Sequence, residues 1–416
     1  MNHDKVFLRE VAHSQTGPFG SQLHQKDYVP HGTPIVTVEH LGDTGFLRQN
    51  LPFVSDKDKA RLFKYVLKEG DIVFSRVGSV DKCTYVSSEE DGWMFSGRCI
   101  RVRCNSNVSP KFLSFYFRLE GFKKMMRSIA VGATMPSLNT SLMDNIPLFL
   151  PPINEQHKIA AVLSAIDAKI ECNNRINAEL EAMAKILHDY WFVQFDFPDK
   201  DGRPYKSTGG RMCYSPALKR EIPAGWKAGL ASDLFDFNPN SPLKKGEEAG
   251  YLDMDSLPLT GFMTKQPKRK IFSGGVKFRN NDVAVARITP CLENGKTGLI
   301  SMLEENEVGF GSTEFIILRG KKNPLPGFVT QLSRSASFRK FAISNMTGTS
   351  GRKRIDAKTL ETYSLPLPPE DILLRYEKVV GPFFKRMTNN AKENSELTQL
   401  RDWLLPMLMN GQVTVM

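Results

Sequence analysis

Three short motifs in this chain could do chemistry, and each lacks a necessary part. Gly295-Lys296-Thr297 ends like a phosphate-binding P-loop, but the glycine expected five residues before Gly295 is Pro290. Gly309-Phe310-Gly311 is a lone fragment of a dinucleotide fingerprint. Asp199 and Asp201 lie close together, but the acidic-x-Lys element of a nuclease site is missing. The sequence also has no Asn-Pro-Pro-aromatic tetrapeptide. We therefore expect a non-catalytic chain.

Metal chemistry is not expected either. The six cysteines are scattered, with no C-x-x-C pair and no histidine nearby, which argues against a zinc site and a disulfide framework. Neither a signal peptide nor a run of about 18 to 20 apolar residues is present. We expect a cytoplasmic protein without membrane partners.

Basic side chains recur where predicted strands end, and this pattern favours binding of a polyanion. The net charge is +11 and the pI is about 9.2. The strand from Gly70 runs into a Gly/Ser loop that ends at Lys82, and the matching strand of the second half runs into Arg287. Such loops can bring backbone N–H groups and cations to DNA phosphates and bases. The expected DNA contacts are Arg76, Ser79, Lys82, Arg287, Thr289, Arg352 and Arg354.

These loops belong to an internal duplication. Leu148, Leu150, Pro151 and Pro152 return 217 positions later as Leu365, Leu367, Pro368 and Pro369. In each half, short apolar runs broken by Gly, Pro and Asn predict strands, and one segment has helical spacing. The fold class is α/β, with two globular domains joined by two long antiparallel coiled-coil helices in a pseudo-two-fold arrangement. The expected parts are a first domain (1–150), a first helix (151–195), a connector (196–222), a second domain (223–367), and a second helix with a tail (368–416).

Both long helices show alternating spacings of four and three, the pattern of a coiled-coil seam. The first seam is Ile159, Leu163, Ile166, Ile170, Asn173, Asn177, Leu180, Ala184, Leu187 and Trp191. Shifted by 217, the second is Tyr376, Val380, Phe383, Met387, Asn390, Asn394, Leu397, Arg401, Leu404 and Leu408, in which Arg401 interrupts the apolar pattern. In an antiparallel pair Asn173 and Asn177 should face Asn390 and Asn394 and set the register, unless they are simply exposed. The opposite faces, including Lys169, Glu181 and Lys185, are either partner-docking or solvated surfaces.

The chain resembles the specificity subunits of type I restriction-modification enzymes over nearly its whole length. The resemblance rests on five segments: Thr16 to Leu23, Gly70 to Lys82, Leu150 to Ile159, Ile222 to Trp226, and Leu404 to Gly411. Three features depart from the family pattern. Asp81 stands where glycine is common, and the Pro368-Pro369 segment lacks the glutamine of the first copy. The beginning of the first domain also lacks the tryptophan that marks the second.

The resemblance implies a subunit without cofactors of its own. It implies binding to double-stranded DNA, to two modification subunits, and to restriction subunits. S-adenosylmethionine, ATP and Mg²⁺ would be bound by those partners. Each domain would read one half of an asymmetric interrupted site. Two alternatives stay open: the specificity partner of a methylation-only system, and a coiled-coil scaffold that binds proteins.

Overall fold

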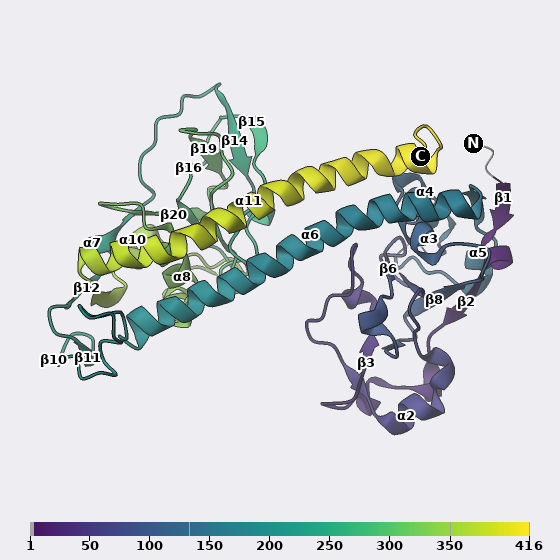
Figure 1. The fold of residues 1–416 in the computed structure, drawn as a ribbon, viewed down its shortest axis with the longest axis horizontal. Helices are drawn as coiled ribbons and strands as arrows, with labels where there is room; N and C mark the ends of the chain where they lie inside the picture. The colour runs from purple at the N-terminus through teal and green to yellow at the C-terminus, as the bar shows by residue number, and fades with distance from the viewer. Residues whose placement is uncertain (1–3, 133, 350, 416) are drawn as a thin grey trace. The chain divides into compact units, whose positions relative to one another are not determined.

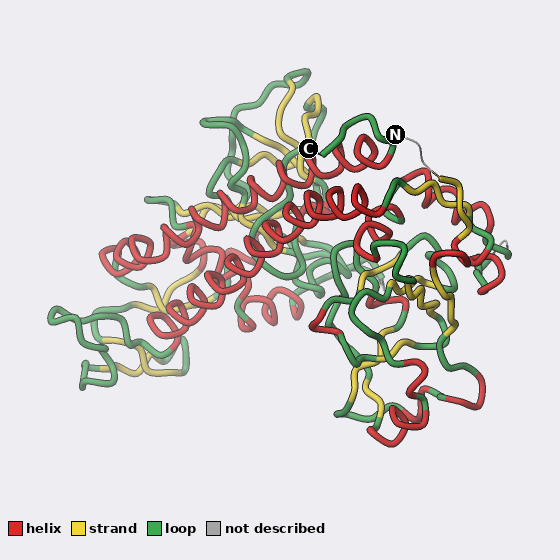
Figure 2. Tube along the Cα trace, turned by 45° about the vertical axis from the view of Figure 1, so that its right-hand side comes forward, coloured by secondary structure: helices red, strands yellow, loops and turns green. Residues whose placement is uncertain are grey.

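The computed structural model describes residues 4–132, 134–349 and 351–415 (Figures 1 and 2). It divides into two compact units. Unit 1 comprises Met1–Lys169 and Leu397–Met416, and unit 2 comprises Ile170–Glu396. Each long helix thus contributes one part to each unit.

Unit 1 is built on an antiparallel four-stranded sheet and a smaller mixed sheet. The first has the order β2 (Ala12–Thr16), β8 (Cys99–Cys104), β5 (Ile72–Ser75) and β6 (Cys83–Tyr85). The second has the order β4 (Phe53–Val54), β3 (Thr33–Val36) and β7 (Met94–Phe95), in which β3 and β7 are parallel. The terminal strands β1 (Asp4–Phe7) and β9 (Pro147–Leu150) pair with each other. The helices are α1 (Leu8–Val11), α2 (Asp56–Arg61), α3 (Pro110–Tyr116), α4 (Glu120–Ile129) and α5 (Thr140–Asp144).

Unit 2 repeats this strand order, with one additional strand in its mixed sheet. Its antiparallel sheet is β13 (Phe235–Phe237), β20 (Phe315–Gly320), β17 (Val283–Ala286) and β18 (Thr297–Leu299). Its mixed sheet is β15 (Lys268–Ile271), β14 (Glu248–Leu252), β19 (Gly309–Gly311) and β16 (Val276–Phe278), with β14 and β19 parallel. Strands β12 (Lys227–Leu230) and β21 (Ser364–Leu367) pair like β1 and β9. The helices are α7 (Ala231–Leu234), α8 (Pro326–Arg334), α9 (Ala336–Ser344) and α10 (Ala357–Glu361). The duplication seen in the sequence is therefore a duplication of topology.

A buried ion pair holds the central strands at the same place in each unit. In unit 1, Asp71 accepts hydrogen bonds from Nε and Nη2 of Arg103, both at 2.6 Å, and from the backbone N–H of Lys68 at 2.8 Å. In unit 2, Asp282 accepts from Nε and Nη2 of Arg319 at 2.6 and 2.7 Å, and from a backbone N–H at 2.7 Å. Since these aspartates directly precede β5 and β17, the pairs tie those strands to β8 and β20.

Long helix α6 (Ile153–His188) ends in a π-helical turn at Asp189–Val193, and α11 spans Glu370–Met409 (Figure 1). The seam residues predicted on α6 are buried or half-buried, as expected for an antiparallel coiled coil. Within unit 1, Arg401 enters the seam and donates a 2.9 Å hydrogen bond to Asp167, which also accepts from Arg118 at 2.7 Å. The interruption that Arg401 makes in the apolar pattern is therefore filled by an ion pair.

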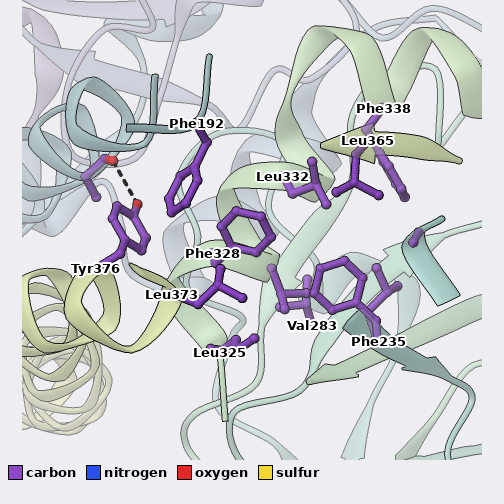
Figure 3. Packing of buried hydrophobic residues seen from close by; sticks show 14 of the residues in the cluster. Phe192, Phe235, Val283, Leu325, Phe328, Leu332, Phe338, Leu365, Leu373 and Tyr376 are labelled. Atoms are coloured by element: carbon purple, nitrogen blue, oxygen red, sulfur yellow. Dashed lines mark hydrogen bonds between the residues drawn. The ribbon is translucent and has the colours of Figure 1, made fainter. Parts of the chain in front are cut away.

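The ends of both long helices pack into the core of unit 2. Figure 3 shows Phe192 and Tyr376 beside Phe328 of α8, and the Tyr376 hydroxyl donates a 3.2 Å hydrogen bond to the carbonyl of Ala184. Leu325, Leu332 and Phe338 join the same cluster. The domain and the helix pair thus share one core within this unit.

The segment predicted as a surface connector, 196–222, is more ordered than its composition indicates. It forms a hairpin of β10 (Met212–Ser215) and β11 (Arg220–Pro223). Phe197 stacks on Trp226 with ring centroids 5.4 Å apart, and both side chains are buried in the core of unit 2. The polar residues therefore cover a small aromatic cluster, which their composition does not reveal.

Candidate nucleic-acid interface

The loop after β5 meets a second loop of unit 1 through backbone hydrogen bonds. The N–H of Leu138 donates to the carbonyl of Arg76 at 2.9 Å, and the N–H of Gly78 donates to that of Pro136 at 2.9 Å. Val131 and Ser137 close the second loop with two mutual bonds of 3.0 and 2.9 Å. Together with residues 17–20 and 96–98, loops 76–82 and 131–138 form what we call the first loop cluster.

The three predicted DNA contacts of the first loop cluster differ in exposure and in the contacts that hold their side chains. Arg76 is half-buried: its Nη1 donates to the carbonyl of Gly97 at 3.1 Å, and its guanidinium lies 5.8 Å from the ring centroid of Phe19. Ser79 and Lys82 are exposed. Arg76 is therefore fixed in a supporting position, whereas Lys82 is accessible to a ligand.

Unit 2 has the same backbone framework. In unit 1 the N–H of Arg76 donates to the carbonyl of Arg98 at 2.8 Å, and in unit 2 the N–H of Arg287 likewise donates to the carbonyl of Glu314 at 2.9 Å. The N–H of Ile355 donates to the carbonyl of Arg287 at 3.0 Å, as Leu138 does to Arg76. Thr347 and Arg354 close the equivalent of the 131–137 loop, again with two mutual bonds. Residues 287–290, 312–314 and 347–356 form the second loop cluster.

The second loop cluster brings together all four predicted contacts of this unit, and two of them are held by acids. Arg354 donates through Nε and Nη2 to the Glu314 carboxylate at 3.0 and 2.7 Å, and Arg287 donates to Asp356 at 2.6 Å. The Arg354 guanidinium lowers the pKa of Glu314, and the Glu314 carboxylate raises the pKa of Arg354. These arginines would have to exchange an acid for a phosphate or a base to bind DNA.

Thr289 and Arg352 complete the set. The Thr289 hydroxyl donates to the carbonyl of Gly351 at 3.2 Å and accepts from the N–H of Lys353 at 3.1 Å, so it braces the loop. The side chains of Arg352 and Lys353 are exposed. Arg352 is therefore accessible to a ligand, as Lys82 is in unit 1.

Sequence reasoning missed the loop 131–138, Phe19 and Lys353. A signal was present, since Gly132 and Gly348 occupy matching positions and both have the left-handed φ that favours glycine, +109° and +127°. Once the loop 347–354 was chosen in the second half, its counterpart in the first half followed from the repeat.

The four seam asparagines also lie together, within unit 2. Asn173 donates to Asn394 at 2.9 Å, and Asn390 donates to Asn177 at 2.8 Å. Asn173 and Asn390 are fully buried. Asn394 in turn donates to Asn174 at 2.8 Å. The amides form a polar layer between α6 and α11.

One proposed docking residue has a different role. Glu181 accepts a 2.7 Å hydrogen bond from the N–H of Phe262, and burial raises its pKa. It therefore links α6 to the second domain and does not belong to an open docking face. Lys185 is exposed and pairs with Asp189 at 2.5 Å.

Exposed apolar side chains recur on both helices at the 217-residue repeat. Met183 and Ile186 are exposed on α6, and their counterparts Leu400 and Trp403 are exposed on α11. Each pair is spaced by three residues, so its members share a helix face. The chain thus carries the same small apolar surface twice, once in each unit.

Among the described residues, no group of three or more His, Cys, Asp or Glu side chains could hold a metal ion. In the same part of the chain, no helix has the length and apolar character needed to cross a membrane.

Comparisons with known proteins agree with this architecture. The family model described as "Type I restriction modification DNA specificity domain" matches residues 2–182. The MjaIX specificity subunit of Methanocaldococcus jannaschii is 26% identical over 330 residues, covering 74% of this chain and 72% of that protein. The HindI specificity subunit of Haemophilus influenzae is 22% identical over 413 residues, covering 86% and 89%.

A solved structure has the same fold. The S subunit of a type I restriction-modification system from M. genitalium superimposes with a TM-score of 0.58 at 16% sequence identity. The superposition covers 98% of this chain and 96% of that one.

Proposed function

We propose that this chain, which belongs to the specificity subunits of type I restriction-modification enzymes, reads the two halves of one interrupted DNA site with its two loop clusters. The observation that carries the proposal is the backbone framework common to both clusters, which places Arg76 and Arg287 at equivalent positions. Each cluster also has exposed basic side chains, Lys82 and Arg98 in unit 1 and Arg352 and Lys353 in unit 2. We assign the reading domains to residues 1–150 and 223–367. A subunit that reads genomic DNA would work in the cytoplasm of a bacterial or archaeal cell.

The target should be asymmetric, because the two clusters carry different side chains on the same backbone. Position 137 is a serine and its counterpart 354 is an arginine, while position 98 is an arginine and its counterpart 314 is a glutamate. Base edges in the major groove are distinguished by their donors, acceptors and methyl groups. Two surfaces of different chemistry would therefore select different half-sites.

Helices α6 and α11 would set the spacing between the half-sites. At about 1.5 Å per residue, they are roughly 54 and 60 Å long, which exceeds the roughly 34 Å of one turn of B-DNA. The asparagine layer would hold their register. Buried amides that pair only in one alignment penalise a slipped one, because a shift would leave polar groups without partners. DNA contacts are expected at Arg76, Ser79, Lys82, Arg287, Thr289, Arg352 and Arg354.

The repeated apolar surface supports two copies of one partner. A single exposed apolar residue is ordinary, but an exposed apolar pair at equivalent positions of both helices offers two similar docking sites. We assign these sites to the two modification subunits, which would bind S-adenosylmethionine and carry out adenine methylation. Restriction subunits, with ATP and Mg²⁺, would complete the enzyme.

The test of this function is a map of N6-methyladenine across the host genome, with and without the gene for this chain. Loss of methylation from one interrupted two-part motif is the expected result. If no motif changes, binding of the purified complex to duplex DNA decides: negligible affinity for duplex would favour a protein-binding scaffold. Restriction activity in the same host distinguishes a full restriction system from a methylation-only one.

Substitution of the exposed Arg352 tests the assignment of a DNA contact to a single residue. If Arg352 reads a base edge, Arg352→Ala should cost about 1–3 kcal/mol at one position of one half-site and relax the choice of base there. Equal weakening on every sequence would make Arg352 a phosphate contact.

A further inference from the structure

We propose that the first loop cluster recognises its half-site through apolar contacts with thymine methyl groups, whereas the second loop cluster recognises its half-site through charge. This inference rests on the proposed function and specifies the chemistry of each reading surface.

The apolar side chains of the first loop cluster are well exposed and lie on two loops, each of which contacts the 76–82 loop. Phe19 is 59% exposed, and on the 131–138 loop Val131 and Met135 are 63% and 66% exposed. A folded chain has no packing reason to present three large apolar side chains on adjoining loops, and such patches mark binding surfaces.

The surrounding structure holds these side chains in place. The Arg76 guanidinium lies against the Phe19 ring. A Cβ added at Gly97 would lie 2.4 Å from the carbonyl oxygen of Pro18. Glycine at position 97 therefore lets residues 96–98 pack closely against residues 17–20. The 131–137 loop is fixed to the 76–82 loop by the hydrogen bond from the N–H of Gly78 to the carbonyl of Pro136. A preformed surface of this kind loses little conformational entropy when it binds.

The equivalent loops have opposite chemistry. Residues 131–137 read Val-Gly-Ala-Thr-Met-Pro-Ser and contain no charged residue. Residues 347–354 read Thr-Gly-Thr-Ser-Gly-Arg-Lys-Arg and contain no large apolar residue. Equivalent hydrogen bonds position both loops. The two loops therefore present different side chains from a similar backbone framework.

The chemistry of the DNA bases identifies the group that these apolar side chains would contact. In the major groove the C5-methyl of thymine is an apolar group, while the other edges are hydrogen-bond donors and acceptors. Lys82 and Arg98 of the same cluster are exposed and can contact phosphates. This combination suits a DNA groove that contains thymine.

The experiment removes one methyl group at a time. The full chain, assembled with the modification subunits of its own system, is bound to duplexes carrying the mapped site, with each thymine replaced in turn by deoxyuridine. Dissociation constants are measured by fluorescence anisotropy at one salt concentration. We expect about fourfold weaker binding when deoxyuridine replaces one or more thymines of a single half-site. This is the effect of losing the burial of one methyl group.

Variants identify the cluster responsible. Met135→Gln and Phe19→Gln replace exposed side chains. Complexes that carry either variant should bind duplexes with thymine and with deoxyuridine equally well at the half-site positions that show the effect. Arg352→Gln is the matched control from the second loop cluster: it should weaken binding overall but retain the fourfold deoxyuridine effect.

Each outcome separates the two proposals. Specific binding that is indifferent to every deoxyuridine substitution overturns the apolar readout and leaves the proposed function intact. Loss of complex assembly in Met135→Gln and Phe19→Gln would assign the apolar side chains to a protein partner and also overturn the readout. Absence of any specific duplex binding by the unmodified complex would instead refute the proposed function.

Discussion

Replacing Asp282 by alanine should destabilise unit 2 severely and leave unit 1 nearly unaffected. Asp282 is 1% exposed, accepts two hydrogen bonds from Arg319, and accepts a third from the backbone N–H of Arg279. The substitution removes the paired carboxylate from a largely buried guanidinium, which keeps the Ser241 hydroxyl at 3.3 Å and the more distant charge of Asp236.

The magnitude follows from the burial of the two partners. Removing one member of a buried pair costs about 3–5 kcal/mol. Because the Arg319 side chain is 24% exposed, water can solvate part of the stranded charge, and we expect the lower end, about 3 kcal/mol. In a unit of this size each kcal/mol lowers the melting temperature by about 2–4 °C, so the expected decrease is about 6–12 °C.

The assay is calorimetry combined with hydrogen exchange read by mass spectrometry. Exchange should accelerate in β17 and β20 and stay unchanged in β5 and β8. The double variant Asp282→Leu with Arg319→Met, which removes both charges, should recover most of the lost stability. A decrease below about 2 °C, which corresponds to at most 1 kcal/mol, would refute the reasoning, as would accelerated exchange confined to unit 1.

Three further predictions follow from features of the long helices. Asn173→Leu should destabilise unit 2 by about 1–3 kcal/mol, because the half-buried Asn394 oxygen and the Glu393 carboxylate each lose a donor. Adding Asn394→Leu should restore part of this loss in chemical denaturation. Replacing Asn177 and Asn390 as well should stabilise the pair but loosen its register, measured by cysteine crosslinking along the helices; a single retained register would contradict this. Burial raises the pKa of Glu377 from 4.5 to about 7, against the lowering effect of two backbone hydrogen bonds. Because the folded state binds this proton more tightly than the unfolded state, protonated Glu377 should stabilise unit 2 fully below pH 4.5, and this contribution should be lost as the pH rises through 7. Calorimetry of Glu377→Gln should show no such pH dependence. Finally, Ile186→Asp and Trp403→Asp should each remove one modification subunit from the complex in native mass spectrometry; retention of both copies in the double variant would exclude this surface.

The long helices and the duplication were predictable because periodicity is a property of one segment at a time. The spacing of Ile159 to Trp191 and its return 217 residues later identify the seam and place the asparagines on it without any tertiary information. The resemblance to type I specificity subunits was also confirmed by the comparisons.

The composition of the site was harder to predict because it depends on loops distant in sequence. Arg354 and Glu314 are 40 residues apart, and nothing local to either residue predicts their bidentate pair. The role of Glu181 was assigned wrongly for the same reason, since its partner Phe262 lies 81 residues away. Phe197 was assigned to a surface connector because the polar residues around it dominate the composition.

The joints between the reading loops are made by main-chain groups, and this has a consequence for how such a protein can change. A hydrogen bond between the N–H of Leu138 and the carbonyl of Arg76 does not depend on either side chain, and the same holds for Ile355 and Arg287. Substitutions at Met135, Arg352 or Lys353 therefore alter the chemistry offered to a ligand without altering the loop path. New recognition can arise here by single mutations that pass through stable, folded intermediates.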